Sequence, residues 1–146
     1  LNSWDEARRK GQFKIWAYVV MPEHVHLLVF PSGEEHEVGA ILRSLKEGFS
    51  RSIVKHWCES SPQMLKRIRT QRGNRIVHSF WQEGGGFDRD IIRWDMIKQA
   101  VDYTEWNPVR RGLVRQPSDW FWSSASARSA GGQRILVPDQ VAIPAS

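Results

Sequence analysis

Two adjoining segments near the start of the chain constrain its fold most strongly. Residues 13–21 read Phe-Lys-Ile-Trp-Ala-Tyr-Val-Val-Met, and residues 24–30 read His-Val-His-Leu-Leu-Val-Phe. Aromatic and β-branched residues of this kind favour β-strands. Pro22 and Glu23 stand between the two segments and suit a tight connection. The sequence therefore predicts two neighbouring strands.

The second of these strands carries two histidines separated by one residue. Successive side chains of a strand point to opposite faces, so His24 and His26 share one face and the valine between them faces the other side. Neutral imidazole is the commonest protein ligand for metals, and such a pair can bind one ion while leaving other coordination positions open. The pair is equally compatible with two partly buried, hydrogen-bonded histidines, and by itself it does not decide between these readings.

Residues 1–12 are rich in helix formers and predict the end of a helix. Two further helices are predicted from the spacing of apolar residues. Apolar residues recur at three- and four-residue steps from about residue 35 to Trp57, which predicts a long amphipathic helix. A second helix is predicted from Trp94 to Trp106, because the residue before Pro108 is pushed out of the helical region. On that helix Tyr103 and Asn107 lie about 40° apart at the edge of the apolar stripe, so both are expected to face the protein.

The most basic stretch lies between the two long helices. Residues 63–75 contain no acid and five basic side chains, namely Lys66, Arg67, Arg69, Arg72 and Arg75. A charge run of this kind is compatible with a mobile surface loop and with a DNA-contacting loop, because charge alone carries no sequence information. Gly73 and Asn74 indicate a turn, residues 75–82 predict another strand, and the glycines at 84–86 predict a break after it.

Composition limits the class of protein. A chain of 146 residues with 40% hydrophobic content suits one domain. Twenty-one basic residues against 16 acidic ones give a net charge of +5, which favours an anionic partner such as nucleic acid. The single cysteine, Cys58, excludes an intrachain disulfide and a cysteine-rich zinc site. No stretch approaches the roughly 20 apolar residues that span a bilayer, so a cytoplasmic protein without a membrane partner is expected.

The C-terminal part changes character. The aromatic cluster at 120–122 is interpreted as a hydrophobic clasp over the core, in preference to a platform on which bases stack. Beyond Ser123 the chain is rich in serine, alanine, glycine and proline. This composition predicts a loosely attached tail, with at most a short strand near Ile135 to Val137.

Two longer motifs together resemble one known protein family. Met-Pro-Glu-His-Val-His-Leu-Leu-Val at 21–29 and Tyr-Thr-Glu-Trp-Asn-Pro-Val-Arg-Arg-Gly-Leu-Val at 103–114 resemble the REP-associated tyrosine transposases, a branch of the single-tyrosine HUH transposases. Segments 80–82, 87–93 and 119–124 also look like that family's pattern, in the same order. The resemblance covers roughly residues 10 to 124. Among the departures, Glu23 stands where many relatives have asparagine, and Arg111 where a small residue is usual.

The resemblance implies a particular architecture. It is an α+β domain with a ferredoxin-like antiparallel sheet of about four strands and helices packed on one face. Residues 1–124 would form the catalytic domain and residues 125–146 the loosely attached tail. The family usually has a further N-terminal strand, and the resemblance implies that this strand is lacking here.

The resemblance also implies a chemistry. His24 and His26 would bind a divalent cation with Asn107 as third ligand, and Tyr103 would attack a DNA phosphodiester to form a 5′-phosphotyrosine. The bound cation would polarise the phosphate and stabilise the departing 3′ oxygen. Magnesium prefers oxygen ligands and manganese tolerates imidazole better, so activity is expected with Mg²⁺ or Mn²⁺.

The implied substrate is single-stranded DNA with hairpin repeats, bound by a monomer or a homodimer. Candidate side chains for holding backbone phosphates are Arg43, Lys46, Lys66, Arg67, Arg69 and Arg110. One alternative is a non-catalytic DNA-binding or regulatory protein derived from such a transposase. A second is a metal hydrolase that uses His24, His26 and His78 with a water nucleophile.

Overall fold

The computed structural model of the chain describes residues 1–11, 13–32, 38–82, 90–91, 93–129 and 136–141. Its elements, in order, are α1 (Asn2–Gly11), β1 (Phe13–Val20), β2 (Val25–Pro31), α2 (Val38–Ser60), α3 (Pro62–Arg67), β3 (Arg69–Arg72), β4 (Arg75–His78), α4 (Trp94–Arg110), the 3-10 helix η1 (Pro117–Asp119) and α5 (Ser124–Ser129). The protein is therefore of the α+β class. No helix within these ranges is long and apolar enough to cross a membrane.

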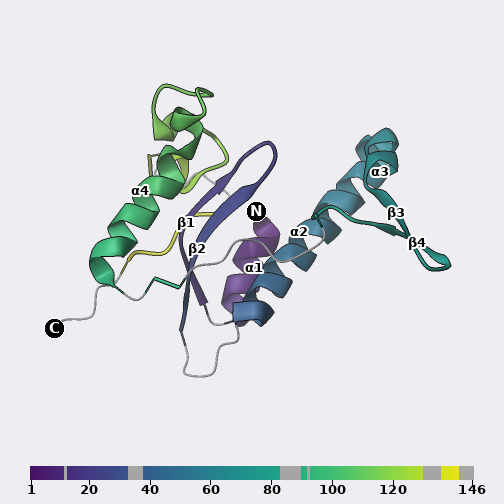
Figure 1. Ribbon diagram of the computed structural model, residues 1–146, viewed down its shortest axis with the longest axis horizontal. Coiled ribbons are helices and arrows are strands. Elements are labelled where there is room, and N and C mark those ends of the chain that lie inside the picture. The colour runs from purple at the N-terminus through teal and green to yellow at the C-terminus, as the bar shows by residue number, and fades with distance from the viewer. Residues whose placement is uncertain (12, 33–37, 83–89, 92, 130–135, 142–146) are drawn as a thin grey trace.

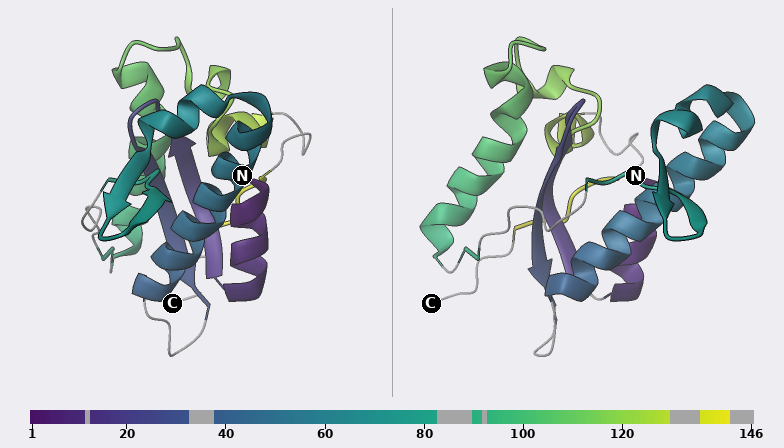
Figure 2. Two further views of the ribbon diagram at one scale, coloured as in Figure 1. Left: turned by 90° about the vertical axis from the view of Figure 1, so that its right-hand side faces the viewer. Right: turned by 45° about the vertical axis from the view of Figure 1, so that its right-hand side comes forward.

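The described strands form two separate antiparallel pairs, β1–β2 and β3–β4. Figures 1 and 2 show β1–β2 between α4 on one face and α1 with α2 on the other. This differs from the expected single sheet of about four strands with helices on one face. The physical reason lies in β3–β4, whose side chains are mostly charged or polar and exposed. That pair has no apolar face to bury beside β2, and it projects with α3 at the far end of α2.

Strand β1 is buried along most of its length because helices pack on both of its faces, α4 on one side and α1 on the other. Its register with β2 shifts between Ile15 and Ala17, which leaves Trp16 as the extra residue of a β-bulge. The bulge allows Ile15 and Tyr18 to join the same buried cluster. Trp16 stacks on Phe30, with ring centroids 4.5 Å apart, and also packs against α4. One strand thus holds the two helical layers together.

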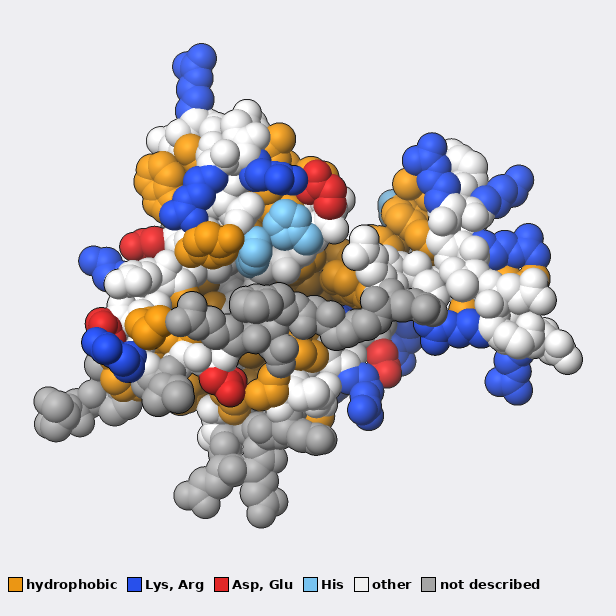
Figure 3. Space-filling model, viewed as in Figure 1, with side chains coloured by type: hydrophobic (Ala, Val, Ile, Leu, Met, Phe, Trp, Pro, Cys, Tyr) orange, Lys and Arg blue, Asp and Glu red, His pale blue; other side chains and the backbone are white. Residues whose placement is uncertain are grey.

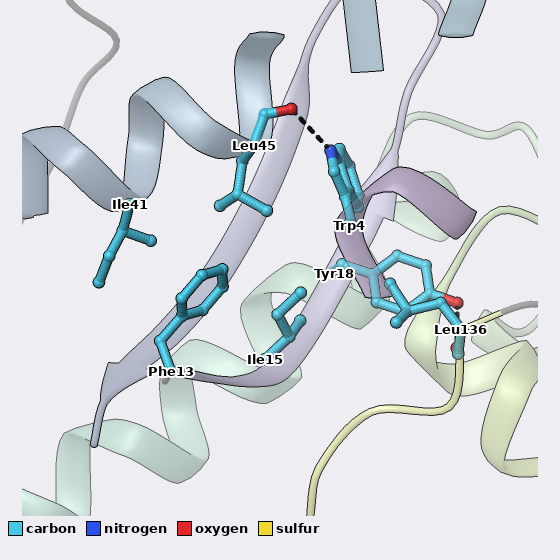
Figure 4. Packing of buried hydrophobic residues seen from close by; sticks show 7 residues of the cluster. All are labelled: Trp4, Phe13, Ile15, Tyr18, Ile41, Leu45 and Leu136. Atoms are coloured by element: carbon cyan, nitrogen blue, oxygen red, sulfur yellow. Dashed lines mark hydrogen bonds between the residues drawn. The ribbon is translucent and has the colours of Figure 1, made fainter. Parts of the chain in front are cut away.

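The main core lies between β1 and the helices α1 and α2 (Figure 4). Its buried members are Trp4, Phe13, Ile15, Tyr18, Ile41, Leu45 and Leu136. The indole nitrogen of Trp4 donates to the carbonyl of Leu45 at 3.2 Å. Val25, Leu27 and Val29 of β2 pack against the same cluster. The opposite face of β2 therefore carries His26, as strand alternation predicts, and His24, which directly precedes the strand, lies beside it.

The described part of the C-terminal segment packs firmly against β1, whereas the sequence predicts a loosely attached tail. Asp139 accepts a hydrogen bond from the backbone nitrogen of Ile15 and donates one to its carbonyl, each at 2.8 Å. Ser124 accepts from the nitrogen of Tyr18 at 3.1 Å. These bonds cover the outer edge of β1, and small serine and alanine side chains let the chain approach it closely. Residues 136–141 form no strand. Ile135 and the glycines at 84–86 lie outside the described residues.

Helix α4 runs past the point where Pro108 was expected to stop it. Proline lacks the N–H that would bond four residues back, but in the last turn this costs a single bond of the helix. The helix ends instead at Arg110, and Gly112 two residues beyond it has a φ of 70°, which is natural for glycine. Leu113 donates to the carbonyl of Pro108 and Gly112 to that of Val109, both at 2.9 Å, which is a Schellman motif. Asn107 and Pro108 therefore belong to the helix.

Candidate metal and tyrosine site

The two histidines are positioned by a tight turn and by the start of β2. The backbone nitrogen of Met21 donates to the carbonyl of His24 at 2.8 Å, which closes the turn that contains Pro22 and Glu23. Beyond the turn, Val25 pairs with Val20 of β1. The strand pairing fixes the backbone on both sides of the histidines and directs their rings towards α4.

The side chains of His24, His26 and Asn107 converge at one place. The Nε2 atoms of His24 and His26 lie 3.1 Å apart, and Nδ2 of Asn107 lies 3.0 Å from the same Nε2 of His26. A ring nitrogen carries either one proton or one lone pair, so the Nε2 of His26 cannot fully satisfy both contacts. The oxygen and nitrogen of the asparagine amide can exchange places by a flip of the group. The two imidazole rings and the asparagine amide are therefore close together, and they make fewer hydrogen bonds with one another than they have donors and acceptors for.

The donor set at this place fits a divalent cation. Two ligands that each lie about 2.1 Å from one ion, at a right angle, are about 3.0 Å apart. The observed separations of 3.0 and 3.1 Å match that value when a flip of the Asn107 amide puts its oxygen, the atom able to bind a metal, in the place of Nδ2. Two imidazoles and one neutral amide leave coordination positions for a phosphate, and they suit Mn²⁺ better than Mg²⁺ because magnesium prefers oxygen.

Burial favours the form of His26 that a metal requires. The pKa of His26 is lowered from its ordinary value, first because burial disfavours the charged ring and second because of the nearby charge of His24. A lowered pKa keeps the imidazole neutral, and only the neutral ring has a lone pair for a metal.

A third histidine does not join this pair. His78 lies on β4 at the far end of α2, and the described ranges contain no cluster of three or more histidine, cysteine, aspartate or glutamate side chains suited to a metal. The alternative of a hydrolase built on three histidines is therefore wrong for this structure. Asn107 is the side chain that completes the group, and it is 7% exposed.

Tyr103 lies one helical turn before Asn107. Its ring meets that of His26 edge-on, with centroids 5.6 Å apart, and the guanidinium carbon of Arg110 lies 4.9 Å from the tyrosine centroid. The side chain is 51% exposed, so the expectation that it faces the protein is wrong. The exposed position follows from the packing of the helix, which turns Thr104 and Asn107 inwards. A large polymer can therefore reach the phenol.

The chain contains two tyrosines, and their surroundings are opposite. Tyr18 is 1% exposed and its hydroxyl donates to the carbonyl of Leu136 at 2.7 Å. It belongs to the core and cannot meet a substrate without unfolding. Tyr103 is therefore the tyrosine available for surface chemistry.

An ion pair joins the histidine turn to the end of α4. Nη2 of Arg111 lies 3.2 Å from Oε1 of Glu23, and the other carboxylate oxygen of Glu23 lies 3.7 Å from Nδ1 of His24. Glu23 and Arg111 are the two departures from the family pattern noted above, and they are partners. Sequence reasoning treated them separately because they are 88 positions apart in the chain. Both side chains are more than half exposed, so the pair orients the turn more than it stabilises the fold.

The candidate phosphate-binding side chains lie in different parts of the molecule. Lys66, Arg67 and Arg69 are exposed on α3 and β3, whereas Arg110 stands beside Tyr103. Arg43 and Lys46 lie on α2. We call residues 51–82, which comprise the end of α2, α3 and the β3–β4 hairpin, the basic arm. Figure 3 shows lysine and arginine side chains projecting around it.

The aromatic cluster divides into two parts. The indole nitrogen of Trp120 donates to the carbonyl of Val20 at 2.9 Å, so Trp120 acts as the expected clasp. Phe121 and Trp122 are 46% and 45% exposed and do not cover the core. The interpretation as a clasp holds for Trp120 alone.

Comparisons with known proteins show which sequences and folds this chain resembles. No protein-family model matches the chain. A REP-associated tyrosine transposase of Escherichia coli is 31% identical over 120 residues, which is 82% of this chain and 58% of the relative. A Haemophilus influenzae protein provisionally given the same name is 26% identical over 113 residues, 77% of this chain and 58% of the relative. The chain thus spans little more than half the length of these relatives.

A solved structure shares the fold. It is described as a REP-associated tyrosine transposase bound to a REP hairpin, with a TM-score of 0.59 and 24% identity over 99% of this chain and 74% of the other. That likeness supports the architecture described above. The two curated sequences that match come from two different organisms. The chain is a homologue of the REP-associated tyrosine transposases.

Proposed function

We propose that this protein cuts and rejoins single-stranded DNA near hairpin-forming repeats, by a metal-dependent transesterification through Tyr103. The observation that carries the proposal is the convergence of His24, His26 and Asn107 beside the exposed ring of Tyr103. A phosphate bound beside these three side chains would lie next to the phenol of Tyr103. The solved relative in complex with a REP hairpin supports hairpin DNA as the substrate class.

The reaction exchanges one phosphodiester for another. The Tyr103 oxygen attacks the scissile phosphorus and forms a new bond to it while the phenolic proton passes to solvent. The bond to the 3′ oxygen breaks, and that oxygen takes up a proton from solvent. The products are a free 3′ hydroxyl and a 5′-phosphotyrosine. A 3′ hydroxyl of another strand can reverse the step and release the tyrosine. The bond energy is retained throughout, so strand transfer needs no nucleotide cofactor.

The protein's own residues position this exchange. His24, His26 and Asn107 would hold the divalent cation, and Arg110 would place a positive charge where the phosphate approaches Tyr103. When bound, Mg²⁺ or Mn²⁺ supplies polarisation of the phosphate and stabilisation of charge on the departing oxygen. Because Tyr103 and Asn107 lie on one helix, α4 sets the nucleophile and the third ligand at a fixed separation.

The direct test is the covalent intermediate. Incubation with end-labelled, single-stranded hairpin DNA and Mn²⁺ should give a protein–DNA adduct that survives denaturing electrophoresis. Tyr103→Phe should abolish the adduct while leaving DNA binding intact, because only the hydroxyl is removed. Trp106→Phe is the matched control, since Trp106 is an exposed aromatic residue of the same helix and should leave the adduct unchanged. Binding of hairpin DNA without any adduct would favour the non-catalytic alternative.

A further inference from the structure

Positive charge is concentrated on the basic arm. Residues 51–82 contain seven lysines and arginines and one acid, Glu59, for a net charge of +6. The whole chain has a net charge of +5, so the remaining residues together carry −1. The arm is therefore the part of the molecule that attracts a polyanion, and it shares no residue with the site at His24, His26 and Tyr103.

A hollow of about 450 Å³ opens at the base of the arm, beside α2. Its described lining consists of Lys46, Ser50, Arg72, His78, Ser79, Phe80, Trp81 and Gln82. This volume lies within the range of roughly 300–1,000 Å³ that is usual for small-ligand sites. The described lining contains two cations, two hydroxyls and the aromatic rings of Phe80 and Trp81, and none of these described residues is a carboxylate. Among these described residues the charged side chains are cations, which suits an anionic ligand.

The aromatic side chains of the hollow, Phe80 and Trp81, are held in place by contacts with α2. The indole nitrogen of Trp81 donates to the carbonyl of Lys46 at 3.0 Å. Phe80 packs on Phe49 and Trp57 of α2, with ring centroids 5.4 and 5.9 Å apart. These contacts fix the rings before any ligand arrives, which lowers the ordering cost of binding.

Cations beside aromatic rings form the combination that recognises a nucleotide. A base stacks on an aromatic face whatever its sequence, while lysine and arginine hold the phosphate. We propose that the hollow binds one unpaired nucleotide of single-stranded DNA, with its base against Trp81 and its phosphate between Lys46 and Arg72. The inference rests on the proposed function only in taking DNA as the polymer. A strand bound here would be held at a second point, away from Tyr103.

The hairpin supplies a matched pair of variants for a test. Arg72 and Arg75 are register partners at the turn of β3–β4, both exposed, but only Arg72 lines the hollow. Arg72→Ala and Arg75→Ala remove the same charge from the same arm. We expect Arg72→Ala to weaken binding of a fluorescent single-stranded oligothymidylate several times more than Arg75→Ala, measured by anisotropy. Equal losses would overturn the proposal, because they would describe a uniform charged surface.

A second variant tests the base. Trp81→Leu keeps an apolar side chain, and its effect should be read only after thermal unfolding shows that the variant is folded. It should weaken binding of the oligothymidylate about fivefold or more, as expected for loss of one stacked base. Binding of an abasic deoxyribose-phosphate strand of equal length should not change. An equal loss on both strands would contradict a base-binding role. Competition by thymidine 5′-monophosphate as effective as by the oligomer would overturn the assignment to a strand.

These measurements separate the subsite from the proposed function. They are made without metal and in the Tyr103→Phe background, so they need no cleavage. If the Arg72 and Arg75 variants differ but the wild type forms no adduct, the subsite stands and the proposed function fails. If the adduct forms but the two variants bind alike, the subsite alone fails.

Discussion

The molecule contains two antiparallel hairpins, and they differ in almost everything except their pairing. Strand β1 is buried along most of its length, whereas β3 and β4 are largely exposed. Helices cover β1–β2 on both faces, while β3–β4 projects at the end of α2 (Figures 1 and 2). An isolated two-stranded hairpin is marginally stable in water. The comparison shows that the first hairpin is held by packing, whereas the second depends on its attachment to α2 and α3.

This difference matches the tasks proposed for the two regions. Transesterification requires side chains to be held to fractions of an ångström, and the packed hairpin offers that precision to His24 and His26. Capture of a polyanion requires charge with little regard to exact placement, and the exposed hairpin offers that to its arginines. Each hairpin thus has the surroundings that its chemistry needs.

The largest expected effect compares one residue type on the two hairpins. Ile15 of β1 is fully buried and Ile76 of β4 is 55% exposed. Ile15→Ala should lower the free energy of unfolding by about 2–5 kcal/mol, because it leaves a cavity in the core. Ile76→Ala should lower it by less than about 0.5 kcal/mol. Urea denaturation measures both. Similar losses at the two positions would show that the arm is part of the cooperative core.

The next effect concerns salt. Lys66→Ala combined with Arg67→Ala should reduce the slope of log affinity against log salt by about 1.4 for single-stranded DNA, because about 0.7 is lost per phosphate contact. Lys10→Ala with Lys98→Ala removes the same charge from exposed positions on α1 and α4, and serves as the control. Affinity titrations over a range of salt concentrations measure the slopes. If both double variants change the slope equally, the arm has no special role in capture.

Much of the packed region could be predicted from the sequence. The β-branched and aromatic residues of β1 and β2 indicate strands, and the apolar period of α2 indicates its buried face. Alternation along residues 24–30 predicts His24 and His26 on the face opposite the core, and the structure places His26 of β2 and the preceding His24 there. The turn at Gly73 also follows from its residue type, and its φ of 58° is one that glycine adopts easily.

The remaining features depend on contacts between distant residues. Serine and alanine after Ser123 indicate disorder by composition, yet Ser124 and Ala127 are buried because small side chains fit against β1. Pro108 ends a helix by local rules, but Gly112 provides the stronger stop four residues later. The pairing of Glu23 with Arg111 and the exposure of Tyr103 follow from how α4 docks on the sheet, and single residues give no signal of that docking.

The smallest expected effect is a pH dependence. The pKa of His26 is lowered by burial and by His24, so the unfolded chain binds a proton more readily than the folded one. Stability is therefore full above about pH 6.5, the ordinary histidine value, and falls as the pH drops below it towards the folded pKa. With a chelator present, His26→Gln should flatten this part of the Tm profile between about pH 5 and 7. His56→Gln, an exposed histidine of α2, should leave it unchanged. Identical profiles for wild type and His26→Gln would contradict the assignment.

The central claim is that Tyr103, beside His24, His26 and Asn107, carries the DNA strand. The most direct measurement is peptide mapping by tandem mass spectrometry after reaction with hairpin DNA and Mn²⁺ and digestion of the DNA. The account predicts a nucleotide mass on the tyrosine of the peptide that contains Tyr103, and none on the peptide that contains the buried Tyr18. A nucleotide on any other residue, or cleaved DNA without a modified peptide, would contradict it.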